Sequence, residues 1–203
     1  MSQLPLSRRC LALVLAAGEG TRMRSDRPKV LHEIAGLSLI GHVLRGVQAA
    51  GADHSVVVVG PDRTDVEAEV RHQDPHAAVV VQRERLGTAH ACLMATAQIE
   101  AGFDDVLVVF GDTPLVPTSI YQQMRQRLAD GLNLVVLGFE AADPQGYGRL
   151  LMQGESLQAI REHKDCSAAE RALHLCNAGL MAIDGRVFLS LLQKIDNANS
   201  QKE

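Results

Sequence analysis

Residues 11–29, LALVLAAGEGTRMRSDRPK, decide the fold that this sequence predicts. The stretch opens with a short apolar run bounded by glycine, and a run of this length is typical of a fully buried strand. Gly18 and Gly20 follow at once, and glycines allow the backbone to approach a ligand with its amide N–H groups turned toward it. A buried strand that leads into a glycine-rich loop predicts a phosphate-handling α/β protein.

Four cations follow these glycines within eight residues: Arg22, Arg24, Arg27 and Lys29. They would supply the fixed positive charge and forked donors that a triphosphate requires. A tight turn with solvated arginines is the alternative interpretation. A dinucleotide motif is not indicated, because Met23 stands where the third glycine of G-x-G-x-x-G belongs, and the sequence contains no G-x-x-x-x-G-K-[ST] P-loop.

The composition narrows the class of protein. The chain has 203 residues, of which 46% are hydrophobic, so it is long enough for one sizeable α/β domain with a real core. A net charge of -4 and an aromatic content of 3% argue against nucleic acid as a partner. No apolar stretch approaches the roughly 20 residues of a membrane span. The cysteines form no C-x-x-C pair, which predicts free thiols in a reducing cytoplasm; they are Cys10, Cys92, Cys166 and Cys176.

Strands and helices are expected to alternate along the first half of the chain. Further strands are predicted at 55–60, 77–82 and 104–110, and helices at 38–50, 61–72 and 88–99, the last capped by Thr88. This alternation favours right-handed crossovers and a parallel sheet. Ligands bind at the carboxyl ends of the strands in such sheets. Three of these ends should therefore form one crevice: the Gly18 loop, Gln82 with Gly87 and Thr88, and Gly111 with Asp112.

Asp112 is the candidate metal ligand. It comes one residue after a buried strand, and Pro114 stiffens the chain that follows. Mg²⁺ prefers one or two carboxylates together with phosphate oxygens, so an aspartate opposite a cationic phosphate loop suits it. The alternative is an ordinary turn or N-cap aspartate.

The second half of the sequence changes character. Strands are predicted at 132–140, 149–152, 156–160 and 173–183, separated by turn signals, with a last helix at 184–195. We expect a nucleotide-binding half at about 8–131 and a mixed-sheet cap at about 132–203, with Glu162 and Asn177 as inward polar candidates. No histidine spacing indicates a metal site, and no Ser/His/Asp arrangement or internal repeat is present.

Several motifs together resemble one known family. Residues 15–23 (LAAGEGTRM) with 28–31 (PKVL) resemble the signature of sugar-nucleotide pyrophosphorylases. Further matches are Gln82, 86–88 (LGT), 111–112 (GD), 146–149 (GYGR), 162–165 (EHKD) and 177–179 (NAG). From about Cys10 to its end, the chain is similar to the N-terminal uridyltransferase domain of the bacterial bifunctional N-acetylglucosamine-1-phosphate uridyltransferase/glucosamine-1-phosphate acetyltransferases.

The resemblance implies an α/β, Rossmann-like nucleotide-diphospho-sugar transferase fold, with a mixed, mostly parallel sheet, helices on both faces and a small sugar-binding cap. The implied reaction converts UTP and N-acetylglucosamine 1-phosphate into UDP-N-acetylglucosamine and pyrophosphate with Mg²⁺, in the cytoplasm, for cell-wall precursors. The implied catalytic residues are Arg22 and Lys29, and Asp112 would hold the metal. The implied substrate-binding residues are Leu15, Ala16, Ala17, Gly18, Lys29, Gln82, Gly87, Thr88, Phe110, Gly111, Asp112, Gly148, Glu162 and Asn177.

Three features depart from the family pattern. Glu19 stands where lysine is frequent, and Phe110 where tyrosine is frequent. The chain also ends before the segment that would supply a second metal ligand, and before the β-helix that carries acetyl transfer and trimer formation, so a monomeric fragment is expected. Two alternatives stay open: a nucleotidyltransferase for another sugar phosphate or nucleotide, and a non-catalytic nucleotide-sugar-binding module.

Overall fold

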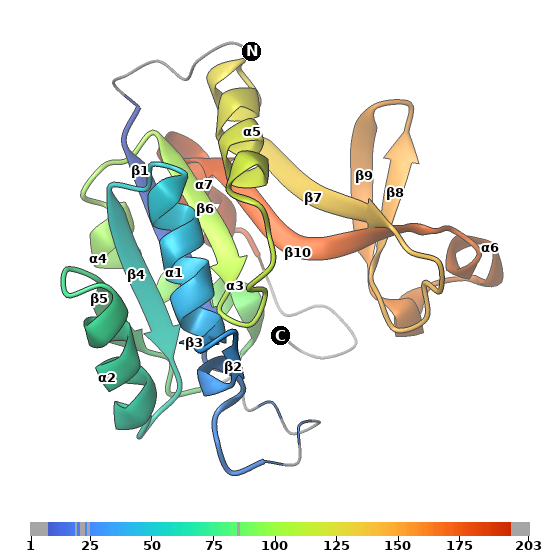
Figure 1. Ribbon diagram of the computed structural model, residues 1–203. Coiled ribbons are helices and arrows are strands. Elements are labelled where there is room, and N and C mark those ends of the chain that lie inside the picture. Colours follow the sequence, from blue (N-terminus) through green and yellow to red (C-terminus); the bar gives the residue numbers. More distant parts are fainter. Residues whose placement is uncertain (1–7, 19, 21–22, 24, 85, 196–203) are drawn as a thin grey trace. The chain divides into compact units, whose positions relative to one another are not determined.

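The computed structural model describes residues 8–18, 20, 23, 25–84 and 86–195 (Figure 1). The chain divides into two compact units. Unit 1 comprises Met1–Val135 and Met181–Glu203, and unit 2 comprises Val136–Leu180. The end of the last strand and the last helix thus belong to the unit that contains the first strand.

The sheet of unit 1 has the mixed, mostly parallel arrangement that the sequence predicts. Its parallel strands lie in the order β5-β4-β1-β6, and the last residues of β10, 181–184, pair antiparallel to β6. The strands are β1 (Cys10–Ala16), β4 (His54–Val59), β5 (Ala78–Val81), β6 (Asp105–Phe110) and β10 (Leu175–Asp184). The central strand β1 is buried along its whole length. This burial explains its continuous apolar sequence, since both faces of the strand are covered.

Helices cover both faces of this sheet (Figure 1). One face carries α1 (Leu39–Ala49), α2 (Thr64–Gln73) and α5 (Thr118–Ala129), and the other carries α3 (Gly87–Leu93), α4 (Thr96–Ile99) and α7 (Gly185–Leu192). Alternate residues of β1, including Leu11 and Leu13, pack with Cys92 of α3 and Phe188 of α7 in one core cluster. The side chains between them point to the opposite face of the sheet, as the pleat requires.

Some helix boundaries differ from the sequence expectations. Thr88 lies inside α3 and does not cap it, and the expected helix 88–99 is two helices, because Thr96 begins a new one with its hydroxyl donating to the Leu93 carbonyl (2.6 Å). The helix expected from Pro61 begins at Thr64, because Asp62 adopts a left-handed conformation (φ 58°) that a helix cannot contain. Helix α5 has no counterpart among the predicted elements.

A short segment after the glycine loop connects β1 to α1. It consists of a 3-10 turn, η2 (Lys29–Leu31), and a hairpin of β2 (Glu33–Ile34) and β3 (Leu37–Ser38). Ser38 then begins α1 by accepting a hydrogen bond from the Gly41 amide (3.0 Å). This N-cap agrees with the helix start that the sequence predicts.

An arginine–aspartate network fixes the end of unit 1 at which β1 and β6 begin. Asp105 is fully buried and accepts hydrogen bonds from Arg125 of α5 (3.0 Å) and from Arg8. Arg125 also donates to the backbone carbonyls of Arg8, Ala50 and Gly51 at 2.8–3.0 Å. One guanidinium therefore joins α5 to the chain just before β1, to the end of α1 and to β6.

Unit 2 is built mainly from antiparallel strands. They are the greater part of β7 (Leu134–Glu140), the hairpin β8 (Arg149–Gln153) and β9 (Ser156–Arg161), and residues 175–180 of β10, with η3 (His163–Asp165) and α6 (Ala168–Arg171) between. β10 pairs with β7 and, at Cys176, with Arg149 of β8. These strands lie where the sequence predicts them to within about two residues.

The Arg149 side chain is the buried centre of unit 2, at 0% exposure. Its guanidinium donates to the backbone carbonyls of Leu173 (2.9 Å), Arg171 (3.2 Å) and Tyr147, and lies 3.5 Å from Nδ1 of His163. Three of these four partners are backbone carbonyls. Arg149 thus joins three separate stretches of chain.

The four cysteines are free and buried. Burial raises the pKa of Cys10 and of Cys92 to about 12, because a thiolate is poorly solvated inside the protein. In the ranges that the structure describes, no helix is both long enough and apolar enough to cross a membrane.

Candidate active site

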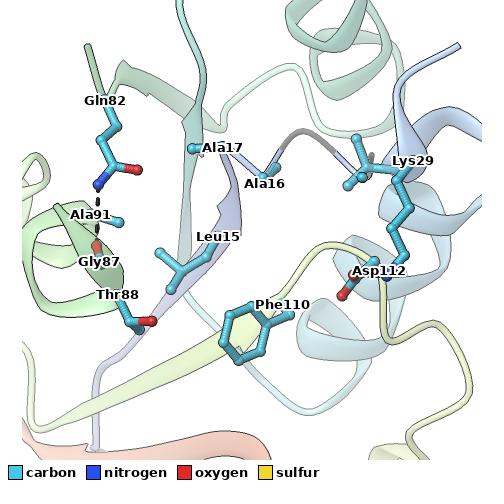
Figure 2. Close-up of a pocket in the computed structure, with 13 residues that line it drawn as sticks. Leu15, Ala16, Ala17, Lys29, Gln82, Gly87, Thr88, Ala91, Phe110 and Asp112 are labelled. Atoms are coloured by element: carbon cyan, nitrogen blue, oxygen red, sulfur yellow. Dashed lines mark hydrogen bonds and ion pairs between the residues drawn. The ribbon is translucent and has the colours of Figure 1, made fainter. Parts of the chain in front are cut away.

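A pocket of about 350 Å³ opens in unit 1 at the carboxyl ends of β1, β5 and β6 (Figure 2). These strands are parallel, so their carboxyl ends reach the same edge of the sheet. The lining residues are Leu15, Ala16, Ala17, Gly18, Gly20, Lys29, Val30, Gln82, Gly87, Thr88, Ala91, Phe110 and Asp112. The three strand ends that the sequence predicts to converge do so.

The glycine loop after β1 leaves room beside its backbone. A Cβ atom added at Gly18 would meet nothing within 4 Å. Gly20 differs: its φ is +62°, and an added Cβ would lie 2.7 Å from Cβ of Lys29. The close approach of Gly20 to Lys29 therefore tolerates only glycine, for both conformational and steric reasons.

Lys29 and Asp112 form an ion pair in this pocket, with Nζ 2.5 Å from Oδ2 (Figure 2). Both side chains are about one-third exposed. Pro28 adopts an extended backbone just before Lys29, which begins η2. On the other side, the Gly111 amide donates to the Leu15 carbonyl (2.9 Å) and so ties the chain before Asp112 to β1. Two short, fixed segments thus bring a cation and an anion together.

Gln82 closes another side of the pocket, and only 4% of its surface is exposed. Its backbone amide donates to the Val59 carbonyl (2.9 Å). Its side-chain Nε2 donates to the Gly87 carbonyl (3.2 Å) and lies 3.1 Å from Nδ1 of His90. A buried side-chain amide held at a pocket wall is suited to reading the polar edge of a planar ligand.

Most of the predicted site residues of unit 1 line this pocket: Leu15, Ala16, Ala17, Gly18, Lys29, Gln82, Gly87, Thr88, Phe110 and Asp112. Gly111 lies behind the lining, where an added Cβ would be 3.3–3.4 Å from side-chain atoms of Val30 and Ala16. The predicted catalytic residue Arg22, and the departure at Glu19, lie outside the described residues.

Three lining residues were not among the predicted site residues: Gly20, Val30 and Ala91. Gly20 and Val30 stand inside the motif stretches and could have been inferred from their neighbours. Ala91 gave no chemical signal, because it contributes only an apolar surface one helical turn after Gly87.

The three residues predicted to bind a sugar lie together in unit 2. A Cβ added at Gly148 would be 3.2 Å from Oε1 of Glu162. The Asn177 backbone amide donates to the Gly148 carbonyl (2.8 Å), and the Asn177 side chain accepts from the Gly179 amide (2.9 Å). Gly148 therefore leaves the space beside the Glu162 carboxylate open.

Comparison with known proteins identifies the family. The family model of MobA-like NTP transferase domains matches residues 12–180, which include the whole glycine loop, Lys29, Gln82 and Asp112. The chain belongs to the MobA-like NTP transferase domains. Membership in this family fits a pocket at the strand ends of an α/β sheet.

Curated relatives of this NTP transferase domain agree with the family resemblance of the motifs. The chain is 55% identical over 197 residues to the bifunctional protein GlmU of Rhodopseudomonas palustris (strain BisA53), and 56% identical over 196 residues to that of Xanthobacter autotrophicus. In each case 97% of this chain is covered but only 44% of the relative. The resemblance drawn from the motifs is confirmed, and the chain spans less than half the length of these relatives.

Solved structures confirm the predicted fold. A UDP-glucose pyrophosphorylase complexed with UDP-glucose superposes with a TM-score of 0.75 and 19% identity, covering 95% of this chain and 82% of its own. A putative glucose-1-phosphate thymidylyltransferase from Bacillus anthracis superposes with a TM-score of 0.79 and 19% identity, and the match covers 96% of this chain and 79% of that structure's chain. At this identity the likeness establishes the Rossmann-like α/β nucleotidyltransferase fold alone.

Proposed function

We propose that this NTP transferase domain binds UTP in the unit 1 pocket and transfers its uridylyl group to N-acetylglucosamine 1-phosphate, giving UDP-N-acetylglucosamine and pyrophosphate. The observation that carries the proposal is the pocket itself, in which the glycine loop, Lys29 and Asp112 meet Gln82. The identity of 55% to proteins named GlmU supports this choice over another nucleotide or sugar phosphate.

The pocket offers different chemistry to the two ends of a nucleotide. Gln82 and Gly87 present amide groups from the β5 end, which suit hydrogen bonding to a pyrimidine base and ribose. Gly18 leaves the backbone open to a phosphate, and Lys29, which lies close against Gly20, adds a positive charge to the same pocket. We assign the base to the first group and the triphosphate to the second.

The donors in the pocket fit a magnesium ion bound together with a nucleotide. Asp112 supplies one carboxylate that lines the pocket and is partly exposed. Among the described residues, no group of three or more His, Cys, Asp or Glu side chains could hold a metal by itself. One carboxylate with phosphate oxygens and water completing the shell is a set that Mg²⁺ prefers. Bound there, magnesium would neutralise negative charge on the phosphates.

The reaction is a substitution at the α-phosphorus that depends on positioning and on charge neutralisation. An ionised oxygen of the sugar phosphate attacks in line with the bond to pyrophosphate, which leaves. The attacking group is already ionised near neutral pH, so no general base is assigned. Lys29, together with Arg22, would hold the triphosphate in this line and stabilise the charge that develops on its oxygens.

We assign the sugar to unit 2. Gly148 and Glu162 leave a carboxylate beside open backbone, and Asn177 is fixed next to them by hydrogen bonds to Gly148 and Gly179. A carboxylate and an amide are suitable partners for the hydroxyl and acetamido groups of N-acetylglucosamine.

We extend the proposal to the longer proteins that this chain resembles. We infer a cytoplasmic enzyme that supplies nucleotide sugar for cell-wall peptidoglycan and lipopolysaccharide precursors. A trimeric acetyltransferase β-helix would follow this domain, which by itself would be a monomer.

A pyrophosphate-release assay with UTP, Mg²⁺ and N-acetylglucosamine 1-phosphate tests the proposal. Lys29→Ala and Arg22→Ala should each lower kcat by about 10²- to 10³-fold, with a smaller rise in KM, because each removes a charge that acts mainly in the transition state. Arg27→Ala is the matched control, since this exposed arginine is paired with Glu33 (2.8 Å) and does not line the pocket; it should stay within about threefold of the parent.

Other nucleotides and sugar phosphates in the same assay define the specificity. Faster turnover with dTTP, CTP or GTP would overturn the assignment of UTP. Calorimetry with UDP-N-acetylglucosamine adds a second measurement, because tight binding without pyrophosphate release would identify a nucleotide-sugar-binding module instead of an enzyme.

A further inference from the structure

His90, on α3, contacts the amide that faces the candidate base site. Its Nδ1 lies 3.1 Å from Nε2 of Gln82, and the same Nε2 lies 3.2 Å from the Gly87 carbonyl oxygen. A carbonyl oxygen can only accept, so the Gly87 contact establishes that the nitrogen end of the amide points this way. His90 Nδ1 must then accept as well, which places the proton of the neutral ring on Nε2.

This arrangement commits both hydrogens of the Gln82 amide group to the protein. The oxygen end lies on the opposite side from Gly87, toward Ala17 and Leu15 (Figure 2). Since Gln82 lines the pocket, the group that it offers to a base is an acceptor. Uracil presents an N3–H donor to such an acceptor, whereas cytosine presents a lone pair at the same ring position.

The contact with Gly87 alone would not fix the amide. The last torsion of a glutamine side chain is a broad sp³–sp² rotation, so one hydrogen bond leaves the plane of the amide free to turn. A second acceptor, on a different side chain, defines that plane. Gln82 has only 4% of its surface exposed, so its amide cannot satisfy its donors with bulk water instead.

We propose that His90 is a positioning residue for base selection: by accepting from Gln82 it holds the amide oxygen toward the base and so favours UTP over CTP. The proposal rests on the proposed function, because it requires the pocket to take a pyrimidine nucleotide with its base beside Gln82.

Calorimetric titration of UTP and CTP, each with Mg²⁺, into His90→Leu, His90→Asn and His90→Gln tests this role without requiring turnover. An asparagine oxygen stands close to the position of Nδ1, whereas a glutamine reaches the position of Nε2. The ratio Kd(CTP)/Kd(UTP) should fall about 10-fold in His90→Leu and His90→Gln, the effect of one net hydrogen bond. His90→Asn should keep the ratio within about twofold of the parent. Circular dichroism checks that each variant is folded.

A double-mutant cycle separates positioning from a merely structural role. In a Gln82→Ala background, His90→Leu should change the UTP Kd less than twofold, because the group through which His90 acts is gone. Equal losses in both backgrounds, or an unchanged nucleotide ratio in both His90→Leu and His90→Gln, would overturn the proposal for His90 alone. If the unmodified chain shows no preference for UTP over CTP, the assignment of uridine in the proposed function fails first, and the role of His90 fails with it.

Discussion

The two units each contain a buried arginine, and the partners of the two differ. Arg125 in unit 1 contacts the fully buried carboxylate of Asp105 in addition to three backbone carbonyls. Arg149 in unit 2 is fully buried among carbonyls and a histidine ring. In unit 1 a counter-charge offsets the cost of burying the guanidinium, whereas the contacts that the structure describes for Arg149 supply carbonyl dipoles and a histidine ring.

The difference teaches what each arginine can stabilise. A carboxylate–guanidinium pair needs one contact to hold two elements together. Through Asp105, Arg125 joins α5 to the start of β6, at the end of the sheet opposite the pocket. Carbonyl acceptors have to be brought into position one at a time. Arg149 therefore fixes the path of the loops around it, among them the turn that contains Gly148 and the chain that follows Glu162.

The largest effect is expected for Arg125→Met. Among the described residues the change leaves the buried Asp105 carboxylate with Arg8 as its one cationic partner, and removing one member of a buried ion pair costs about 3–5 kcal/mol of unfolding free energy. Denaturant unfolding measures the loss. Arg125→Met with Asp105→Asn should be more stable than Arg125→Met alone, since the neutral amide needs no counter-charge; a double variant that is weaker still would refute the ion-pair interpretation.

Arg149→Met should lower the unfolding free energy by less, about 1–3 kcal/mol. The change leaves backbone carbonyls without a donor, but it also removes a buried charge. The effect should be local to unit 2. Alkylation followed by mass spectrometry measures it: Cys166 and Cys176, in unit 2, should become reactive, while Cys10 and Cys92 stay protected. Equal exposure of all four thiols would show that Arg149 supports the whole chain instead.

A second comparison between the two units concerns the N-terminal caps of helices α7 and α6. In unit 1, Asp184 caps α7 by accepting from the Arg186 amide (2.9 Å), and Asp184→Ala should cost about 1 kcal/mol at pH 7. The hydrogen bond from the Arg186 side chain lowers the pKa of Asp184. A carboxyl with a lowered pKa stabilises the fold above its unfolded pKa, about 4, and this stabilisation is lost as the pH falls through the folded value. The difference in unfolding free energy between parent and variant should therefore become smaller below pH 4. A difference that stays constant with pH would show that the charge of Asp184 does not contribute to the cap.

The smallest effect is expected at the cap of α6 in unit 2. Ser167 and Glu170 form a capping box there, with the Ser167 amide donating to Glu170 (2.7 Å). This hydrogen bond lowers the pKa of Glu170, but the side chain is still partly exposed to water, which screens its charge and competes for its hydrogen bonds. Glu170→Ala should shift the thermal midpoint less than Asp184→Ala does. A larger shift would mean that α6 anchors unit 2 more firmly than its exposure indicates.

Much of the fold and of the pocket could be predicted from the sequence. Apolar runs such as the one in β1 specify buried strands, and alternation with helices then specifies a parallel sheet whose strand ends meet. That logic predicts that Gly18, Gln82 and Asp112 lie at one edge of the sheet, and all three line the pocket.

The elements and contacts that the sequence did not reveal depend on long-range packing. Helix α5 carries apolar residues at Tyr121, Met124 and Leu128, but Arg125 lies beside them, and a buried arginine in an apolar stripe looks like a surface position until its partner is known. The burial of Arg149 could not be inferred from its residue type, because arginines are mostly exposed and its acceptors lie more than 20 residues along the chain. The contact between His90 and Gln82 depends on where α3 begins, which the sequence places only approximately.

The ion pair between Lys29 and Asp112 has a consequence for how the pocket loads its proposed ligands. A divalent cation that arrives alone must separate the carboxylate from the lysine, and an anion that arrives alone must separate the lysine from the carboxylate, so each leaves one protein charge without its partner. A triphosphate that enters with its cation gives both residues new partners in a single event. The two ligands should thus bind cooperatively, and by reciprocity each raises the affinity for the other by the same factor.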